Sequence, residues 1–278
     1  MKIAVIGKNG QLACCLKEVA PEGLDISFFR SDKVDITRSD TYESLASSNL
    51  IINCAAYTAV DKAEEFPEKV FMVNRMGVIQ LVAFCEAHQI KLIHFSTDFV
   101  FSGEGNTPYK EEDFTGPRSV YGASKLAGEE VILQSSLSAL VIRTSWLYSP
   151  FGHNFCKTML RLGGERIEVS VIVDQVGTPT SALDLARVVF EIIQKGFPET
   201  PELLHISNTG HCSWADFARE IFRQKKLSVT VNDTTTEAYN LPAKRPKYSV
   251  LSTEKLVFKY GIAMRPWKEA LSEVLIRL

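Results

Sequence analysis

The sequence carries no excess of either charge and no cysteine pattern of a metal site. Lysine and arginine number 31 against 33 aspartate and glutamate residues, a formal net charge of −2. That balance argues against a nucleic acid or a membrane surface as the partner and favours a small molecule. The six cysteines include neither a Cys-x-x-Cys pair nor the Cys/His spacing of a zinc site. We therefore expect reduced, mostly buried thiols and no bound metal.

Long apolar segments are missing as well. The apolar residues 3–6 are too few for a signal peptide, and no later uninterrupted run approaches the length of a membrane span. The chain is therefore expected to be cytoplasmic. The five histidines are scattered, which is typical of packing or surface residues. What is present is an ordinary globular composition, 278 residues of which 45% are hydrophobic, enough for one large domain or two lobes.

The N-terminus has the pattern of a strand, a glycine turn and a helix. A β-branched run at residues 2–6 ends in Gly7, and Gly10 and Ala13 follow at the start of a helical pattern. Gly7 permits a tight turn, Gly10 lets the backbone approach a pyrophosphate, and the small Ala13 lets the helix pack closely on the strand. The pyrophosphate then lies at the helix N-terminus. The pattern predicts a dinucleotide-binding unit.

The end of the second predicted strand, residues 24–29, is where such a unit contacts the adenosine ribose. Arg30 can bind a 2′-phosphate, which favours NADPH, whereas Asp32 can pair with a free ribose hydroxyl, so that NADH stays open. Asp35 and Ile36 follow at a place suited to flank the adenine. Asp35 has an alternative role as the cap of the next helix.

Two further predicted strands end where ligands bind in doubly wound sheets. The strand at residues 50–56 ends in small side chains that leave room for a ligand. The strand at residues 91–97 ends in Thr97, and Asp98 follows it. A hydroxyl at this place can donate a hydrogen bond to a substrate oxygen.

Tyr121 and Lys125 stand four residues apart in a segment with a helical pattern, which places them on one face of a helix. A phenol is a poor proton donor or acceptor at neutral pH because its unperturbed pKa is about 10. A lysine ammonium held nearby favours the phenolate and brings that proton into use. The pair can therefore move a proton to or from a carbonyl or carbinol oxygen. The same spacing also fits a half-buried tyrosine beside a solvated lysine.

The alternation of strands and helices loosens from about residue 149. We therefore predict an α/β fold with a Rossmann-type, doubly wound parallel sheet at residues 1–148. A smaller C-terminal α/β substrate lobe is expected at residues 149–278, with allowance for parts of it to return to the first domain. A cleft between the two is the natural substrate site.

These motifs together resemble the extended short-chain dehydrogenase/reductase family, in which a glycine turn, a threonine and a Tyr-x-x-x-Lys pair occur in this order. Further blocks narrow the resemblance to the dTDP-4-dehydrorhamnose reductases within that family. The blocks are residues 10–12, 53–64, 95–101, 120–129, 143–146, 174–180 and 242–246. They span nearly the whole chain.

The resemblance implies an activity and roles for three residues. The activity is reduction of the C4 keto group of dTDP-4-dehydro-L-rhamnose to dTDP-L-rhamnose with NADPH or NADH, a step toward cell-surface polysaccharides such as lipopolysaccharide. By this resemblance Tyr121 protonates the C4 oxygen, and Thr97 hydrogen-bonds the same oxygen. Lys125 holds the nicotinamide ribose and lowers the pKa of Tyr121.

Further residues are assigned to the two ligands by the motifs and the resemblance together. Those expected at the cofactor, besides Tyr121 and Lys125, are Gly7, Gly10, Gln11, Leu12, Arg30, Asp35, Ile36, Ala56, Tyr57 and Thr58. Those expected at the substrate are Thr97, Asp98, Trp146, Asn154 and Arg245. Asn154 and Arg245 would meet the diphosphate, for which a guanidinium is well suited, although Arg245 also fits an exposed turn rich in proline.

The chain departs from the family pattern at two places. Ala13 replaces the usual third glycine, and Tyr57 stands where a histidine or tyrosine is common. Some relatives carry magnesium at a dimer interface, bound partly by an acidic residue on the first helix. Residues 13–16 offer no carboxylate here, so we predict no metal, and the sequence leaves formation of a homodimer open.

Three alternatives share parts of this pattern. A sugar-nucleotide dehydratase needs a pair of carboxylates after the threonine, but Phe99 follows Asp98 here, which favours net reduction. A sugar-nucleotide epimerase should retain its cofactor through the cycle, whereas a reductase must release it. A dinucleotide-binding regulatory subunit of the methionine adenosyltransferase type is the third alternative, and the intact Thr97, Tyr121 and Lys125 argue against it.

Overall fold

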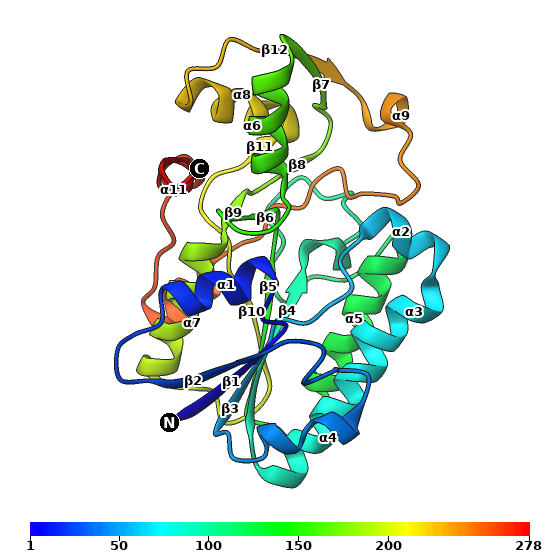
Figure 1. The fold of residues 1–278 in the computed structure, drawn as a ribbon. Coiled ribbons are helices and arrows are strands. Elements are labelled where there is room, and N and C mark those ends of the chain that lie inside the picture. Colours follow the sequence, from blue (N-terminus) through cyan, green and yellow to red (C-terminus); the bar gives the residue numbers. More distant parts are fainter.

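The computed structural model describes residues 1–278, and a six-stranded parallel sheet lies at its centre (Figure 1). The strand order is β10-β5-β4-β3-β1-β2. The strands are β1 (Lys2–Ile6), β2 (Asp25–Phe29), β3 (Leu50–Asn53), β4 (Lys91–Thr97), β5 (Ala139–Thr144) and β10 (Glu202–His205). The order reverses between β1 and β3, and ligands of such sheets bind outside the carboxyl ends of the strands at this switch point.

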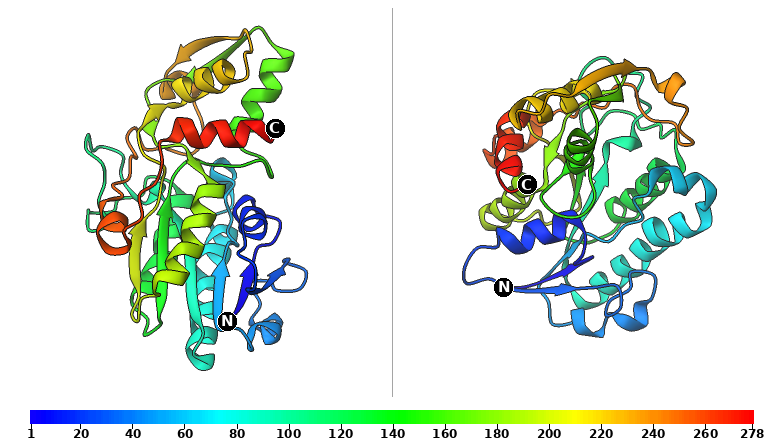
Figure 2. Two further views of the ribbon diagram at one scale, coloured as in Figure 1. Left: turned by 90° about the vertical axis from the view of Figure 1, so that its left-hand side faces the viewer. Right: turned by 45° about the horizontal axis from the view of Figure 1, so that its top comes forward.

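Helices cover both faces of the sheet, as Figures 1 and 2 show. Along β1, Ile3 and Val5 point into one core while Ala4 and Ile6 point into the other, because successive side chains of a strand alternate. Strands buried on both faces form nearly continuous apolar runs. One face carries α1 (Gln11–Glu18) and α7 (Ala182–Lys195), and the other carries α4 (Gly77–His88) and α5 (Val120–Leu133). The predicted doubly wound α/β fold is confirmed.

One continuous helical segment runs from Pro67 to His88. It joins α3 (Pro67–Phe71), a π-helical turn at Met72–Met76, and α4. By length and composition alone this segment could cross a membrane, although polar residues interrupt its apolar residues. Its residues Val78, Leu81 and Cys85 are buried in the core on one face of the sheet, and core helices of globular proteins commonly have this length and apolar content.

The C-terminal lobe lies above the carboxyl ends of the strands in Figure 1 and is built from short strand pairs and helices. The pairs are β6 (Leu147–Tyr148) with β9 (Thr180–Ser181), β7 (Glu168–Ile172) with β12 (Thr230–Thr234), and β8 (Val176–Gly177) with β11 (Cys212–Ser213). The helices are α6 (Phe155–Glu165), α8 (Trp214–Gln224), α9 (Thr236–Tyr239) and α11 (Trp267–Ile276). The remaining α-helices are two short ones, α2 (Val60–Glu65) and α10 (Glu254–Tyr260).

Parts of the second half of the chain return to the central sheet. Strand β10 pairs with β5, and α7 packs beside α1 on the sheet. The division of the chain at residues 148 and 149 into two domains therefore stays a prediction.

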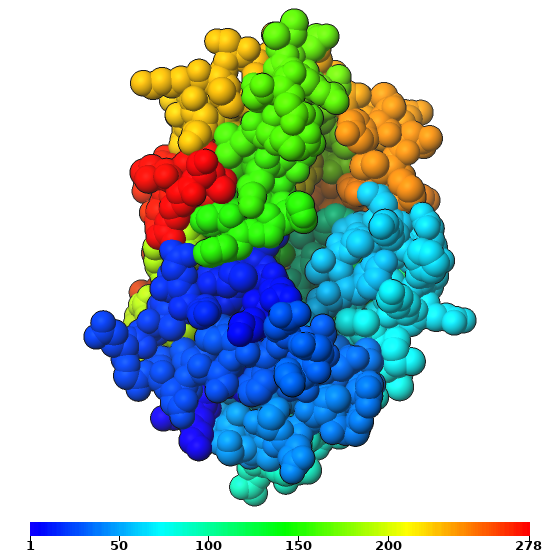
Figure 3. Space-filling model, viewed as in Figure 1, coloured from blue at the N-terminus to red at the C-terminus, as the bar shows by residue number.

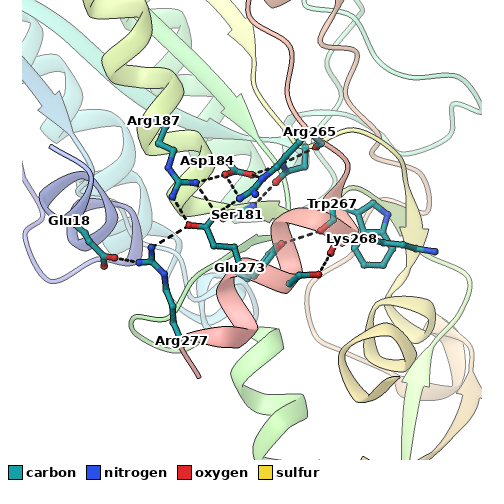
Figure 4. A network of polar contacts seen from close by, with 12 residues as sticks. Glu18, Ser181, Asp184, Arg187, Arg265, Trp267, Lys268, Glu273 and Arg277 are labelled. Atoms are coloured by element: carbon teal, nitrogen blue, oxygen red, sulfur yellow. Dashed lines mark hydrogen bonds and ion pairs between the residues drawn. The ribbon is translucent and has the colours of Figure 1, made fainter. Parts of the chain in front are cut away.

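A network of ion pairs fastens α11 to α7 (Figure 4). Arg265 forms two bonds to Asp184, from Nε at 2.8 Å and from Nη2 at 2.7 Å. Glu273 of α11 accepts from Arg187 at 2.5 and 3.0 Å and also from Arg265. Arg277 pairs with Glu18 at the end of α1. The network joins three helices that lie far apart in the sequence.

Candidate active site

The turn between β1 and α1 forms the cradle that the glycine pattern predicted. Gly7 has φ +87°, and a Cβ atom there would lie only 2.7 Å from the amide nitrogen of Ala55. Any side chain at Gly7 would therefore displace the end of β3. Gly10 is the N-cap of α1, its amide donates to the Gly7 carbonyl at 2.9 Å, and Ala13 is fully buried. The backbone here can approach a pyrophosphate closely.

A pocket of about 330 Å³ opens beside this turn, and its lining fits the adenosine end of a dinucleotide. Arg30 is exposed at its rim and pairs with Asp32 at 3.5 Å. Asp35 Oδ1 accepts from the Thr37 amide at 2.9 Å, so Asp35 closes a tight turn. The lining residues are Gly7, Lys8, Asn9, Gly10, Arg30, Ser31, Val34, Asp35, Ile36, Cys54, Ala55, Ala56 and Val73.

The α-helix that Asp35 would cap in its alternative role is not formed. The chain after Asp35 makes two short 3-10 turns, Ser39–Thr41 and Glu43–Leu45. Thr41 supplies the reason, because its side chain bonds the backbone of Asp35 and Arg38 and offers the chain an alternative to helical hydrogen bonds. Asp35 and Ile36 thereby stay at the edge of the pocket.

Gln11 and Asn154 join the glycine turn to the C-terminal lobe. Gln11 Oε1 accepts from Asn154 Nδ2 at 2.9 Å and from the Ser149 hydroxyl at 3.0 Å. The other side-chain atom of Asn154, Oδ1, caps α6 by accepting from the Lys157 amide at 3.0 Å. Asn154 thus already has protein partners, and its contact with a diphosphate stays a prediction. Leu12 is buried in the core, so only its backbone can meet a ligand.

The loop after β3, which holds Ala56, Tyr57 and Thr58, is anchored by a buried asparagine. Asn74, in the π-helical turn, accepts from the Tyr57 amide at 2.8 Å and donates to the Tyr57 carbonyl at 3.1 Å. Its amide also donates to the Ser124 hydroxyl at 2.9 Å. Asn74 therefore fixes this loop against the helix of Tyr121 and Lys125. Thr58 is exposed and makes no side-chain hydrogen bond.

Thr97 and Tyr121 meet where β4 ends and α5 begins. The Thr97 hydroxyl accepts from the Phe99 amide at 3.2 Å and donates to Asp98 Oδ1 at 3.1 Å. Gly122 allows α5 to approach, because a Cβ there would lie 2.3 Å from the Phe99 carbonyl oxygen. The rings of Phe99 and Tyr121 pack edge to face with centroids 5.7 Å apart. The predicted threonine and tyrosine are therefore neighbours.

Burial governs protonation at this place. It raises the pKa of Tyr121 to about 12, with the Thr97 hydroxyl lowering it and the Asp98 charge adding to the rise. Burial also raises the pKa of Asp98 to about 6, while the nearby hydroxyls of Ser249 and Thr97 act to lower it. Tyr121 therefore keeps its proton at neutral pH and can act as a donor.

Lys125 lies one helical turn beyond Tyr121, with only 2% of its surface exposed. Its Nζ lies 3.1 Å from Nε2 of His94 on β4, and His94 Nδ1 lies 2.9 Å from Nδ2 of Asn53 on β3. Burial lowers the pKa of Lys125 to about 8, while Glu129 raises it. Burial and the lysine charge also hold the pKa of His94 well below its usual value.

A second cavity of about 240 Å³ lies between the C-terminal lobe and the end of β4. The indoles of Trp146 and Trp214 stack with centroids 3.6 Å apart. Trp146 has φ +45°, a conformation that non-glycine residues rarely adopt and that often marks functional sites. The lining residues are Phe99, Trp146, Phe155, Met159, Ser170, Val171, Ile172, Gln175, Trp214, Tyr239, Leu241, Arg245 and Pro246. In Figure 3 the surface is hollowed between the α6 segment in green and the α9 segment in orange.

Arg245 lines this cavity but has a carboxylate partner. Its two terminal nitrogens donate to the two oxygens of Asp61 on α2 at 3.0 and 2.8 Å. The ion pair spans from the C-terminal lobe to the sheet domain. A role of Arg245 toward a diphosphate stays a prediction, and it requires exchange of this partner.

Several residues of the site were missed by the sequence analysis. His94 was expected to be a packing or surface residue, and only its place two residues before Ser96 on the ligand-binding strand hinted otherwise. Trp214 was hidden because it begins an amphipathic helix and fits the pattern of a core residue. The pairing of Asp61 with Arg245 joins residues 184 positions apart, for which one sequence holds no signal.

The doubly wound sheet, the glycine cradle and the neighbouring Thr97, Tyr121 and Lys125 define a Rossmann-type oxidoreductase. The family model of the RmlD substrate binding domain matches residues 1–278. A dTDP-4-dehydrorhamnose reductase of Sinorhizobium fredii is 40% identical over 97% of this chain and 95% of that protein. The chain belongs to the dTDP-4-dehydrorhamnose reductase family.

Solved structures agree with this assignment. A dTDP-4-dehydrorhamnose reductase from Clostridium acetobutylicum is 40% identical, covers 99% of both chains and has a TM-score of 0.94. The Bacillus anthracis dTDP-4-dehydrorhamnose reductase in complex with NADP is 37% identical over the full length of both chains, with a TM-score of 0.95. The fold and the family therefore extend over the whole chain.

Proposed function

We propose that this chain reduces the C4 keto group of dTDP-4-dehydro-L-rhamnose to give dTDP-L-rhamnose, with NADPH as the reductant. The product is a precursor of rhamnose-containing cell-surface polysaccharide. The observation that carries the proposal is the meeting of Thr97, Tyr121 and Lys125 between the glycine cradle and the aromatic cavity, in a chain of this family.

The proposed chemistry at the carbonyl needs a proton donor, an oxygen-binding group and a charge to stabilise the phenolate. Tyr121 donates its proton to the C4 oxygen as a hydride reaches the carbon, and its raised pKa keeps that proton in place beforehand. The Thr97 hydroxyl donates a hydrogen bond to the same oxygen. Lys125, as an ammonium, stabilises the phenolate that remains on Tyr121.

The residues at the glycine cradle fit a dinucleotide, since Gly7 with φ +87° makes the tight turn against the end of β3 that brings the N-terminus of α1 to the pocket. We assign Gly7, Gly10 and Gln11 to the pyrophosphate, and Asp35 and Ile36 to the adenine. Arg30 at the pocket rim supports NADPH over NADH. Leu12, Ala56, Tyr57 and Thr58 complete the proposed contacts. When bound, the nicotinamide supplies the hydride.

The aromatic cavity is the proposed sugar-nucleotide site. We assign Asp98 and Trp146 to the sugar, and Asn154 and Arg245 to the diphosphate. Arg245 can exchange the Asp61 carboxylate for a diphosphate, because a guanidinium binds both in the same two-pronged geometry. This exchange would couple substrate entry to the contact between the lobes.

The proposed setting is the cytoplasm. The sugar nucleotide and NADPH both carry several negative charges and do not cross a membrane unaided, so the reaction takes place where both are made. Whether two copies of the chain associate is a separate question that light scattering answers.

The test uses the purified chain with NADPH and enzymatically prepared dTDP-4-dehydro-L-rhamnose. We expect NADPH absorbance to fall and dTDP-L-rhamnose to appear in equal amounts. A chain that consumes no NADPH but binds a methionine adenosyltransferase tightly would instead be the regulatory subunit. Release of NADP after each turnover separates a reductase from an epimerase.

A further inference from the structure

Behind Tyr121 lies a buried line of three polar side chains. Asn53 at the end of β3, His94 on β4 and Lys125 on α5 are exposed by only 1, 1 and 2%. Asn53 and His94 are register partners in the sheet. Because all three side chains are almost fully buried, the hydrogen bonds between them decide which nitrogen atoms carry protons.

The directions of these hydrogen bonds follow from the backbone. The amide N–H of Ala55 can only donate, and it lies 3.0 Å from Asn53 Oδ1, which fixes the orientation of the Asn53 side chain. The Asn53 NH₂ group then faces His94 Nδ1 at 2.9 Å and donates to it. A neutral imidazole whose Nδ1 accepts carries its own proton on Nε2.

This tautomer of His94 determines the protonation state of Lys125 that fits the contact. The Nε2–H of His94 points at Lys125 Nζ, 3.1 Å away. An ammonium has three donors and no acceptor, so only a neutral amine can accept this hydrogen bond. Burial acts in the same direction, since it lowers the pKa of Lys125 to about 8.

The other groups that face Lys125 oppose this effect only weakly. Glu129 on α5 favours the ammonium, but both of its oxygens are bound by buried Arg143 of β5, at 2.7 to 3.1 Å. The Cys54 thiol on β3 has a pKa raised by burial and stays neutral. The phenol of Tyr121 is also neutral, with a pKa of about 12.

We propose that Asn53 and His94 are positioning residues that hold Lys125 as a neutral amine in the cofactor-free chain at alkaline pH, and that Lys125 takes up one proton when the dinucleotide binds. The inference rests on the proposed function, in which Lys125 serves as an ammonium. In the bound state Lys125 donates to His94 Nε2, and the ring proton lies on Nδ1.

The proton balance of this change is one proton from solvent. The Nε2 proton of His94 passes to Lys125, a solvent proton ends on Nδ1, and Asn53 turns its oxygen to accept it. Ala55 then loses the Asn53 acceptor, and its amide belongs to a residue that lines the dinucleotide pocket. Cofactor binding and the protonation of Lys125 are thereby linked through β3.

Nitrogen NMR of histidine-labelled protein tests the proposal directly. At about pH 9, above the Lys125 pKa of about 8, the cofactor-free chain should show His94 as the neutral Nε2–H tautomer. Addition of NADPH should convert it to Nδ1–H. His205 is an internal control, because its Nδ1 faces the Tyr109 carbonyl at 3.1 Å and must carry the proton throughout. An Nδ1–H signal for His94 in the cofactor-free chain would overturn the proposal.

Calorimetry of NADPH binding in two buffers supplies a second readout. At about pH 9 the phosphates of NADPH are already ionised, so roughly 0.9 proton should enter the protein per NADPH bound. Asn53→Asp places an acceptor opposite His94 Nδ1 and should abolish this uptake. Asn49→Asp adds the same charge at the exposed start of β3 and should leave it unchanged.

The outcomes separate this inference from the proposed function. Tight NADPH binding and normal reduction without proton uptake would contradict the role of Asn53 and His94 alone. Failure to bind NADPH at all would contradict the proposed function. Equal uptake in wild type and Asn53→Asp would show that the proton goes to another group.

Discussion

Burial, with the Asp98 charge adding to it, raises the pKa of Tyr121 to about 12, so the phenol holds its proton at neutral pH. In the proposed reaction, hydride transfer leaves negative charge on the substrate oxygen, and Tyr121 neutralises that charge by donating its proton. At the scale of single residues, therefore, the proposed role of Tyr121 is that of an acid kept protonated until the substrate arrives.

Replacement of Tyr121 by phenylalanine removes this proton and little else, because the ring keeps its edge-to-face contact with Phe99. We expect kcat to fall by about two orders of magnitude or more, while the Kd for NADPH stays near that of the wild type. Steady-state kinetics and fluorescence titration with NADPH measure the two quantities. Near-normal turnover in Tyr121→Phe would show that another group donates the proton.

Asp98→Asn tests the electrostatic cost of the buried carboxylate. Because the folded pKa of Asp98 is raised to about 6, its contribution to stability is full below its unfolded pKa and is lost as pH rises through about 6. Relative to the wild type, the variant should gain on the order of 1 to 2 kcal/mol in unfolding free energy between about pH 5 and about pH 8. Urea denaturation at both pH values measures this, and a constant difference would contradict it.

The sequence placed the proposed catalytic residues on the elements where the structure has them, but it did not reveal the side chains that surround them. Local patterns in the sequence indicate these residues: Thr97 stands at the end of a predicted strand, and Tyr121 and Lys125 have the spacing of neighbours on a helix. The tautomer of His94 and the pairing of Asp61 with Arg245 depend on side chains that only the folded chain brings together. One sequence holds no record of such contacts, so these could not be foreseen.

At the scale of elements, the short strand β8 shapes the aromatic cavity. A Cβ on Gly177 would lie 2.5 Å from the indole of Trp146, so only glycine lets that ring stack on Trp214. The longer elements followed from sequence periodicity: β4 and β5 have the expected bounds. The two-residue strands of the C-terminal lobe, β6, β8, β9 and β11, have no periodicity to detect, since tertiary pairing alone creates them.

Gly177→Ala should disturb the sugar-nucleotide site and spare the cofactor site. We expect KM for the sugar nucleotide to rise by about tenfold, equivalent to about 1.4 kcal/mol, with an unchanged Kd for NADPH. Gly164→Ala on α6 is the matched control, because a Cβ there meets nothing within 4 Å, and it should leave both quantities unaltered. Equal KM values for the two variants would refute the role given to the Trp146 stack.

At the scale of the whole molecule, the two lobes are joined by polar contacts as well as by packing. Gln11 bonds to Asn154 across the lobes, Arg245 bonds to Asp61, and the network around Glu273 holds α11 on α7. The sequence predicted the doubly wound parallel sheet, and the division of the chain into two lobes stays a prediction. It gave no sign of how the C-terminal helix is fastened, because the partners of Glu273 lie on separate segments.

Glu273→Gln should weaken this fastening in a pH-dependent way. Hydrogen bonds from Arg187 and Arg265 lower the pKa of Glu273 to about 2, so its contribution is present above its ordinary pKa and is lost as pH falls toward about 2. We expect the variant to lose about 1–2 kcal/mol of unfolding free energy near neutral pH. The difference in unfolding free energy between the wild type and Glu273→Gln should disappear as the pH falls toward about 2.

Glu165→Gln is the control for this network, because Glu165 makes only an exposed pair with Arg161 on α6. Urea denaturation should place that variant within a few tenths of a kcal/mol, about 0.5 at most, of the wild type. A loss of unfolding free energy as large as that of Glu273→Gln would show that the effect is not specific to the network around Glu273.

The transfer of deuterium from NADPH that carries two deuterium atoms at C4 of the nicotinamide tests the central claim most directly. The purified chain is incubated with dTDP-4-dehydro-L-rhamnose and the labelled cofactor, and the product is analysed by mass spectrometry and proton NMR. We predict dTDP-L-rhamnose with one deuterium, located at C4 of the sugar. Unlabelled product, label at another carbon, or no product at all would contradict the assignment of this chain as a C4 carbonyl reductase.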